Sequence, residues 1–201
     1  MARIRRSEKN RETLLEQGIS LLSEHGYHGT GLKLILDTVK VPKGSFYNYF
    51  ESKEHFAAEI LDTYAAKLLT QFDEYAAKTE DAPLQIIENV YSTMLKTFEA
   101  EGHIKGCLLG NMAAEIGGHS DLCTASMLST LKKWKQRIVA LIENAQAEQV
   151  VRSDMSAESL ADLLWCAWEG ALLRMKIEGN TDIVKNVLST LLNQIFQAKT
   201  A

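Results

Sequence analysis

The segment from residue 42 to residue 54 carries the side chains with the clearest chemical use. Within six positions it offers a cation, a small hydroxyl, an aromatic ring and an amide, at Lys43, Ser45, Tyr47 and Asn48. Cations and hydroxyls suit phosphate oxygens, while an amide suits the edge of a base. Lys53 adds a second cation just beyond them. We therefore expect this segment to contact a nucleic acid, with a solvated surface residue as the alternative at each position.

Two short helices joined by a turn are expected to position these side chains. Apolar residues at steps of three and four predict a helix over 32–39, and Thr30 is expected to cap it with its hydroxyl facing a phosphate. A turn at 38–41 follows. Pro42 then suits the first position of a second helix, 43–49, because its missing N–H needs no intrahelical partner there. This order of helix, short turn and helix is that of a helix-turn-helix DNA reader.

Helices on both sides are predicted to support the reader. Ser52 is expected to cap a long helix that continues to about Lys78, with Glu54 in its positive first turn. An amphipathic helix is predicted over 11–25 and is ended by Gly26. The residues before it are expected to form a basic arm that lies along DNA or reaches a minor groove, with a frayed terminus as the alternative.

These residues resemble, in order and spacing, the DNA-binding domain of the TetR (tetracycline-repressor) family of bacterial transcription regulators. The resemblance covers about the first 60 residues and rests on Gly26-Tyr27, Gly29-Thr30, 43–50 and 52–54. It implies phosphate contacts for Thr30, Lys43, Tyr47 and Lys53, and base-edge contacts for Lys33, Ser45 and Asn48. Lys40 and Pro42 depart from the family pattern, which commonly has a glycine and a capping serine there. Lys40 fits this turn only if its backbone avoids or tolerates a positive φ.

The composition favours long helices throughout. Of 201 residues, 46% are hydrophobic and only two are proline, and no stretch shows the dense Val, Ile and Thr alternation of strands. We predict an all-α fold of nine to ten helices. A helix-turn-helix DNA-binding domain is expected over 1–55, and an effector-binding and dimerisation domain over 56–201.

The distribution of charge agrees with that division. Residues 1–53 carry nine Lys and Arg against six Asp and Glu, whereas residues 54–201 carry thirteen against twenty. A basic head on an acidic body is expected where only one domain binds phosphates, and an ordinary uneven surface is the alternative.

The charged first residues do not form a signal peptide, no run of 18 apolar residues is present, and three cysteines suit a reducing compartment. We therefore expect a cytoplasmic protein.

The last two predicted helices, 156–178 and 182–198, carry more apolar residues than one buried face requires. The surplus is expected to pair two copies in a four-helix bundle, which would place two readers one DNA turn, about 34 Å, apart on a palindrome. The family resemblance implies the same homodimer. A hydrophobic hairpin buried within one chain is the alternative. The predicted interface residues are Leu164, Trp168, Ala171, Val184, Leu188, Leu191 and Ile195.

The second domain is expected, from the family resemblance, to bind an effector that alters the spacing of the two readers. Cys107 is the sharpest candidate residue, because it follows Gly106 at a predicted helix start, where the positive end favours a thiolate. A small buried hydrophobe is its alternative role. Soft, bulky side chains suited to an apolar cavity, or to ordinary core packing, are Met112, Trp165, Trp168, Met175, Phe98 and Tyr91.

The segment from Gly106 to Glu115 also resembles a branch of the family that includes the N-ethylmaleimide-reductase repressor, whose cysteine senses electrophiles. Lys176 matches an amine position in that branch and is expected to meet Cys107 across the fold. The resemblance thus implies a repressor released from a palindromic operator by a small-molecule effector, or by an electrophile that modifies a cysteine.

Three other kinds of function are weighed against this one. The pairs His103/Cys107 and His119/Cys123 have i, i+4 spacing that suits zinc, but glycines interrupt both stretches, so no metal site is expected. The chain lacks a phosphate-cradling glycine loop and a Gly-x-Ser-x-Gly motif, so neither catalysis nor a cofactor is expected. A helical ligand-binding or scaffold dimer without sequence-specific DNA reading is the remaining alternative, and it would bind all DNA fragments equally.

Overall fold

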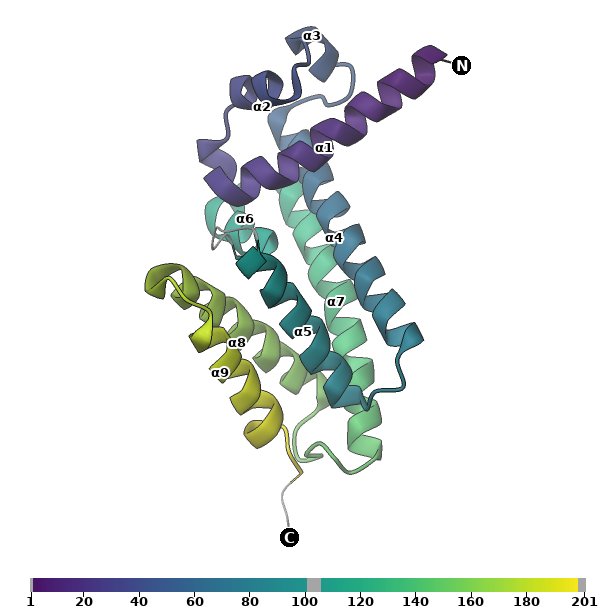
Figure 1. Ribbon diagram of the computed structural model, residues 1–201, viewed down its shortest axis with the longest axis vertical. Coiled ribbons are helices and arrows are strands. Elements are labelled where there is room, and N and C mark those ends of the chain that lie inside the picture. Colours follow the sequence, from purple (N-terminus) through teal and green to yellow (C-terminus); the bar gives the residue numbers. More distant parts are fainter. Residues whose placement is uncertain (1, 101–105, 199–201) are drawn as a thin grey trace. The chain divides into compact units, whose positions relative to one another are not determined.

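The computed structural model describes residues 2–100 and 106–198, most of them helical (Figure 1). The helices are α1 (Ala2–Gly29), α2 (Leu32–Val39), α3 (Lys43–Phe46), α4 (Lys53–Lys78), α5 (Pro83–Ala100), α6 (Leu108–Ile116), α7 (Asp121–Ala147), α8 (Ala157–Glu178) and α9 (Asp182–Thr190), followed by the π-helical turn η1 (Leu191–Ile195). In the described ranges, β pairing is limited to one bridge between Val151 and Gln197. The predicted all-α fold is confirmed. None of the helices described is long and apolar enough to cross a membrane.

The helices form two compact units. The first unit contains Met1–Leu68 and Cys107–Thr130, and the second contains Leu69–Gly106 and Leu131–Ala201. The helices α4 and α7 therefore contribute residues to both units, whereas α6 belongs wholly to the first. The predicted boundary between residues 55 and 56 separates a DNA-binding domain from an effector-binding and dimerisation domain. The two compact units do not test that assignment of function, so it stays a prediction.

Aromatic rings form the core of the first unit. Phe46, Phe50 and Phe56 are at most 1% exposed, and their ring centroids lie 4.7 to 5.3 Å apart. The helices α1 and α4 approach closely at Gly18, where a Cβ would overlap the Ile60 side chain. Because Phe46 is drawn into this core, the opposite side of α3 is left facing solvent.

The beginning of the chain differs from expectation. The helix α1 starts at Ala2, so residues 2–10 are helical and not frayed, and the predicted role of this stretch as a basic arm on DNA stays a prediction. Arg, Glu and Lys in this stretch are good helix formers, and they extend the helix toward the N-terminus. Gly26 breaks the helix as predicted, with the non-helical angles φ 71° and ψ 178°, and a short further helical stretch continues as far as Gly29.

The turn between α2 and α3 resolves the question raised by Lys40. This residue adopts φ 56° and ψ 39°, and the Leu36 carbonyl accepts from its N–H and, at 3.2 Å, from that of Val41. A left-handed residue closing a helix usually is glycine, and here a lysine tolerates that geometry. Pro42 lies at the N-cap, one position before its predicted place, and α3 ends at Phe46 instead of residue 49.

In the second unit, α8 and α9 pack against each other (Figure 1). Ser156 caps α8 by accepting from the Ser159 N–H at 3.2 Å, and Gly179 ends it with φ 71°, both as expected from their residue types. The last helix stops at Thr190, short of its predicted end at residue 198. In η1 the Phe196 N–H donates to the Leu191 carbonyl at 2.8 Å, which is the wider hydrogen bond of a π-helix.

Candidate nucleic-acid interface and effector site

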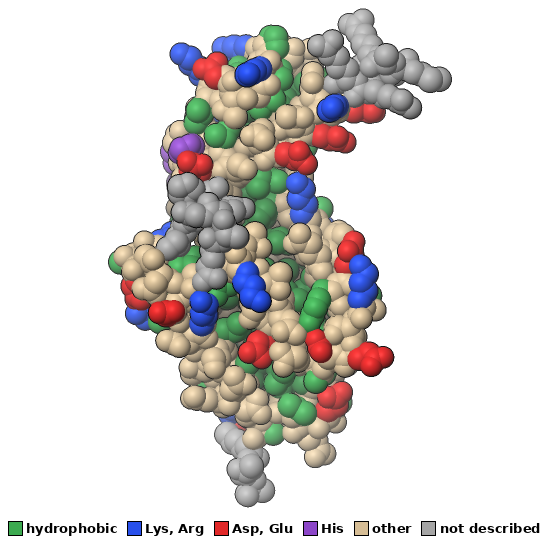
Figure 2. Space-filling model, in the orientation of Figure 1, with side chains coloured by type: hydrophobic (Ala, Val, Ile, Leu, Met, Phe, Trp, Pro, Cys, Tyr) green, Lys and Arg blue, Asp and Glu red, His purple; other side chains and the backbone are tan. Residues whose placement is uncertain are grey.

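The solvent side of α3 and the turn after it carry the predicted contact residues. Lys43 and Asn48 are exposed, Ser45 is half-buried, and Tyr47 keeps 51% of its surface exposed while its ring lies edge-on to Phe46 at 5.5 Å. Lys33 is exposed on α2. Figure 2 shows Lys and Arg side chains, in blue, at the α2–α3 end of the first unit. Exposed cationic, phenolic and amide groups on one short element match the acceptors of phosphates and bases.

Lys53, the first residue of α4, is held by the protein itself. Its Nζ donates to the Tyr27 carbonyl at 2.6 Å and lies 4.1 Å from the centroid of the Tyr27 ring. Partial burial lowers the pKa of Lys53, while the Glu115 carboxylate acts in the opposite direction. An ammonium has three N–H donors, so two remain for other acceptors. The first turn of α4 is capped as predicted, because Ser52 Oγ accepts from the His55 N–H at 3.0 Å.

Thr30 does not face a phosphate, and this prediction is wrong. Its side chain is fully buried, and its hydroxyl donates toward the carbonyls of Gly26, at 2.7 Å, and Leu21, at 3.2 Å. The bend at Gly26 leaves carbonyls of the last helical turn without helical partners, and Thr30 satisfies them. The N-cap of α2 is Gly31, which has no side chain to cap it.

Cys107 is the N-cap of α6, and its side chain is 4% exposed. Met112, one turn further along α6, is fully buried. The other two cysteines differ: Cys166 is exposed on α8, whereas Cys123 is fully buried and its thiol lies 3.7 Å from the Glu54 carbonyl. Burial raises the pKa of the Cys123 thiol, which keeps that sulfur protonated and weakly nucleophilic.

Aromatic residues form a cluster inside the second unit. The ring centroid of Tyr91 lies 4.7 Å from that of Trp168 and 5.9 Å from that of Trp134, and Phe72 lies 5.4 Å from Trp134. Trp134 donates its indole N–H to the Tyr91 hydroxyl at 3.0 Å. Trp168 is 2% exposed, and its indole N–H has no hydrogen-bond partner among the described residues. Trp165 is half-buried.

Trp134 and Phe72 were not among the cavity residues expected from the sequence. The spacing of apolar residues along their helices could have identified them. Trp134, for example, lies one helical turn before Ile138, and the side chains of Trp134 and Ile138 are both buried. Lys176 is exposed on α8, and its Cε lies 3.0 Å from the position that a Cβ on Gly106 would take. Gly106 has a φ of 69°, so both its backbone and the nearby lysine favour glycine there.

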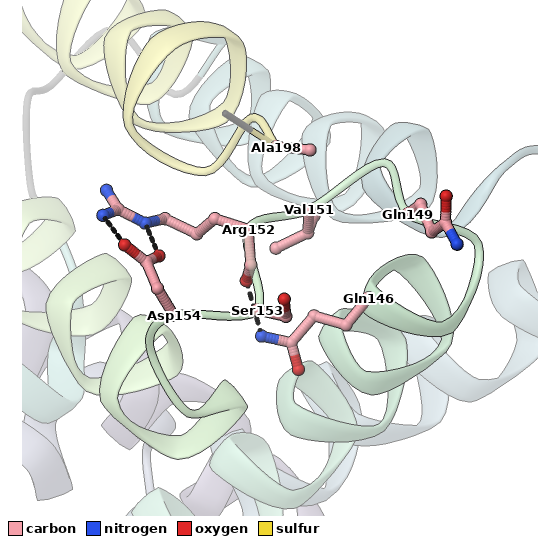
Figure 3. A pocket seen from close by; sticks show the side chains of 7 residues that line it. All are labelled: Gln146, Gln149, Val151, Arg152, Ser153, Asp154 and Ala198. Carbon is pink, nitrogen blue, oxygen red and sulfur yellow. Dashed lines mark hydrogen bonds and ion pairs between the residues drawn. The ribbon is translucent and has the colours of Figure 1, made fainter. Parts of the chain in front are cut away.

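A pocket of about 210 Å³ lies at the connector between α7 and α8 (Figure 3). Arg152 lines it and is paired with Asp154 at 2.5 and 2.7 Å, and the Gln146 amide donates to the Arg152 carbonyl at 2.8 Å. The lining residues are Gln146, Gln149, Val151, Arg152, Ser153, Asp154 and Ala198. None of the expected effector residues is among them.

Six of the seven predicted interface residues have no surface left to bury against a partner. Leu164, Trp168, Ala171, Val184, Leu188 and Leu191 are all at most 7% exposed, because they pack within the single chain, where α8 lies against α9 and Trp168 against Tyr91 of α5. Only Ile195 of the set is exposed, at 38%. The apolar surplus of α8 lies on its other side, at Leu163, Cys166, Gly170, Leu173 and Ile177.

Of the two His/Cys pairs considered as zinc ligands, the structure describes only one completely. His103 and Lys105, near Cys107, lie outside the described residues. His119 is exposed whereas Cys123 is buried, so the second pair does not point to one place. Within residues 2–100 and 106–198, no group of three His, Cys, Asp or Glu side chains is arranged to hold a metal ion.

Comparison with known proteins gives matches along most of the chain. A family model described as bacterial regulatory proteins, tetR family, matches residues 14–60, and one described as tetracyclin repressor-like, C-terminal domain, matches residues 83–191. The HTH-type transcriptional repressor DhaR of Mycobacterium sp. (strain GP1) is 32% identical over 188 residues, which cover 94% of this chain and 91% of that protein.

The HTH-type transcriptional repressor NemR of Escherichia coli (strain K12) is also 32% identical, over 189 residues that cover 92% of this chain and 93% of that protein. The crystal structure of the reduced form of E. coli NemR matches with a TM-score of 0.85 and 29% identity, covering 96% of this chain and 99% of that one.

Proposed function

This chain belongs to the TetR family of bacterial regulatory proteins, and we propose that it is a cytoplasmic, homodimeric repressor that leaves a palindromic operator when an effector binds or Cys107 is modified. The observation that carries the proposal is the solvent side of α3 and the turn after it, where Lys43, Tyr47 and Asn48 are exposed around the buried Phe46. The relatives named as transcriptional repressors support the direction of regulation.

On DNA, two kinds of contact are proposed. Lys43, Tyr47 and Lys53 bind phosphates and set the orientation of the reader. Lys33, Ser45 and Asn48 contact base edges and supply sequence preference. Replacing a phosphate ligand should therefore weaken all sites alike, whereas replacing Asn48 should blur the preference among sites.

For the dimer, we propose the solvent side of α8 as the interface. Leu163, Cys166, Gly170, Leu173 and Ile177 follow each other at steps of three and four, which gives one continuous stripe along the helix. Leu173 and Ile177 are 63% and 80% exposed, so a partner would remove much apolar surface from water. Gly170 allows close approach of two helices at the middle of the stripe.

Cys166 gives a direct test of this interface, because it lies within the stripe. A short bis-maleimide should link two wild-type chains, and Cys166→Ser should prevent the linkage without changing the dimeric mass. A dimer that is not linked through Cys166 would place the interface elsewhere, and a chain that stays monomeric at all concentrations would exclude the dimer.

For release, we propose Cys107 as the residue that reacts with electrophiles. In support, the chain is similar to NemR, whose matching structure is described as the reduced form, and the segment from Gly106 to Glu115 resembles that branch of the family. N-ethylmaleimide should release operator DNA from wild type and from Cys166→Ser, but not from Cys107→Ser. Because Cys107 is 4% exposed, its modification should be slow. Equal release from wild type and Cys107→Ser would remove Cys107 from the mechanism.

Footprinting on the DNA that flanks its own gene tests the function as a whole. We expect a protected palindrome that disappears when the electrophile is added to wild type. Uniform binding along every fragment would instead identify a helical dimer that does not read sequence.

A further inference from the structure

A carboxylate at the end of α6 binds the backbone just after Tyr27 and lies close to the backbone just before it. Glu115 Oε2 accepts from the His28 N–H at 2.9 Å. On the other side, the missing side chain of Gly26 makes room for the same carboxylate, since a Cβ there would overlap Glu115 Oε1. The backbone of Gly26 also has a φ of 71°, which disfavours any other residue.

Tyr27, held in this way, in turn holds Lys53. Its carbonyl accepts from Lys53 Nζ at 2.6 Å, and its ring lies under the same ammonium with 4.1 Å between Nζ and the centroid. A lysine side chain loses considerable rotamer freedom when it is fixed, and these contacts fix it before any DNA arrives. Two of its three N–H donors stay available for a phosphate.

We propose that Glu115 is a positioning residue that presents the Lys53 ammonium to DNA by fixing the Gly26–His28 backbone. This inference rests on the proposed DNA-binding function. All the contacts involved lie within the first unit. Since Cys107 is the N-cap of α6 and the helix ends one residue after Glu115, a shift of this helix changes the support of a DNA-contacting side chain.

A double-mutant cycle on operator affinity tests the proposal. Glu115→Ala should lower the affinity about 3- to 10-fold in wild type, because Lys53 must then be ordered on binding. In a Lys53→Met background the same change should alter affinity less than about 2-fold. Glu115→Gln keeps an oxygen that accepts from the His28 N–H, so it should bind within about 2-fold of wild type. An equal loss in both backgrounds, or no loss in wild type, would overturn the inference.

Two controls separate folding and function from positioning. Thermal denaturation shows whether each variant is folded, and Glu115→Asp, whose carboxylate falls short of His28, replaces Glu115→Ala if that variant is not. The NMR signal of the dimethylated Lys53 amine reports its surroundings without DNA, and we expect it to move in Glu115→Ala. An unchanged signal overturns the inference whatever the DNA result. Absence of any preferred site in wild type, with a moved signal, counts against the proposed function alone.

Discussion

Asp73 on α4 and Arg137 on α7 form a two-pronged ion pair within the second unit. Nε and Nη2 of the arginine donate to the two carboxylate oxygens at 2.6 and 2.5 Å. The hydrogen bonds from Arg137 lower the pKa of Asp73 below its ordinary value of 3.8, against a smaller opposing effect of burial. Both partners keep contact with water, so the stabilisation is reduced by solvent screening to about 0.2–1 kcal/mol.

This pair predicts a pH-dependent effect of Asp73→Asn. A carboxylate with a lowered folded pKa stabilises the fold above its unfolded pKa and loses that contribution as the pH falls through the folded value. The variant should therefore be less stable than wild type at pH 7, with the difference closing in acid below about pH 3.8. Urea unfolding of wild type and variant at pH 7 and at a pH below about 3.8 measures this difference in stability. Glu143→Gln, at an exposed position, is the matched control. A difference that persists unchanged in acid would contradict the prediction.

Lys40 predicts a stabilising substitution. Its φ of 56° is strained for a residue with a Cβ, and glycine relieves that strain at some entropic cost. We expect Lys40→Gly to raise the free energy of unfolding by about 0.5–1 kcal/mol. Ala66→Gly, at an exposed site inside α4, should lower it by about 1 kcal/mol. Chemical denaturation of both variants gives the answer, and a loss of stability in Lys40→Gly would show that the lysine side chain contributes more than the strain costs.

At the residue scale, the sequence predicted which side chains could bind DNA better than it predicted which of them face solvent. The exposed positions of Lys43, Tyr47 and Asn48 follow from a short helix and turn that bury the neighbouring Phe46, which the sequence pattern contains. The burial of Thr30 does not follow from its type, because a hydroxyl satisfies a phosphate and a backbone carbonyl equally well. Glu115 was missed for a related reason: its partner is a backbone N–H made accessible by the bend at Gly26.

At the scale of elements, the contact of α1 with α4 depends on Gly18. A Cβ there would overlap Ile60 Cδ1 and lie 2.8 Å from Phe56 Cζ, and both side chains are at most 1% exposed. A core of this density has no room for an added methyl group. The glycine is thus kept inside a helix despite its poor helix propensity.

Gly18→Ala should therefore destabilise the fold by about 1–3 kcal/mol, although alanine favours the helix by about 1 kcal/mol. Ile60→Val removes the overlapping Cδ1 and alone should cost about 0.5–1.5 kcal/mol. Combined, the two changes should cost clearly less than their sum, because the second makes room for the first. Strictly additive free energies of unfolding would show that the two side chains do not meet.

The elements that begin and end with strong local signals were predicted almost to the residue. Ser52 and Ser156 mark the starts of α4 and α8, and Gly179 marks the end of α8. By contrast, α9 passes into η1, after which the Arg152 N–H donates to the Phe196 carbonyl at 2.8 Å. The end of this last helical segment is determined by a residue distant in sequence, so no local sequence pattern predicts it.

At the scale of the whole molecule, six of the seven residues predicted for the dimer surface are buried within the single chain, and the interface itself stays a prediction. Both sides of α8 carry apolar residues at helical spacing, and the sequence does not indicate which side packs on α9. The structure assigns the inner side to Leu164, Trp168 and Ala171 and leaves the outer side exposed. Each of the two compact units likewise combines segments that are distant in sequence. The composition of the chain therefore could not predict which segments pack together.

The dependence of operator affinity on salt tests the central claim, that the face of α3 and the start of α4 bind DNA phosphates. If Lys43 and Lys53 of two protomers each neutralise one phosphate, the logarithm of the affinity should fall against the logarithm of salt with a slope of about −3.6. Lys43→Met should reduce that slope by about 1.8, whereas Lys132→Met, an exposed lysine on α7, should leave it unchanged. Equal slopes for wild type and Lys43→Met would contradict the account.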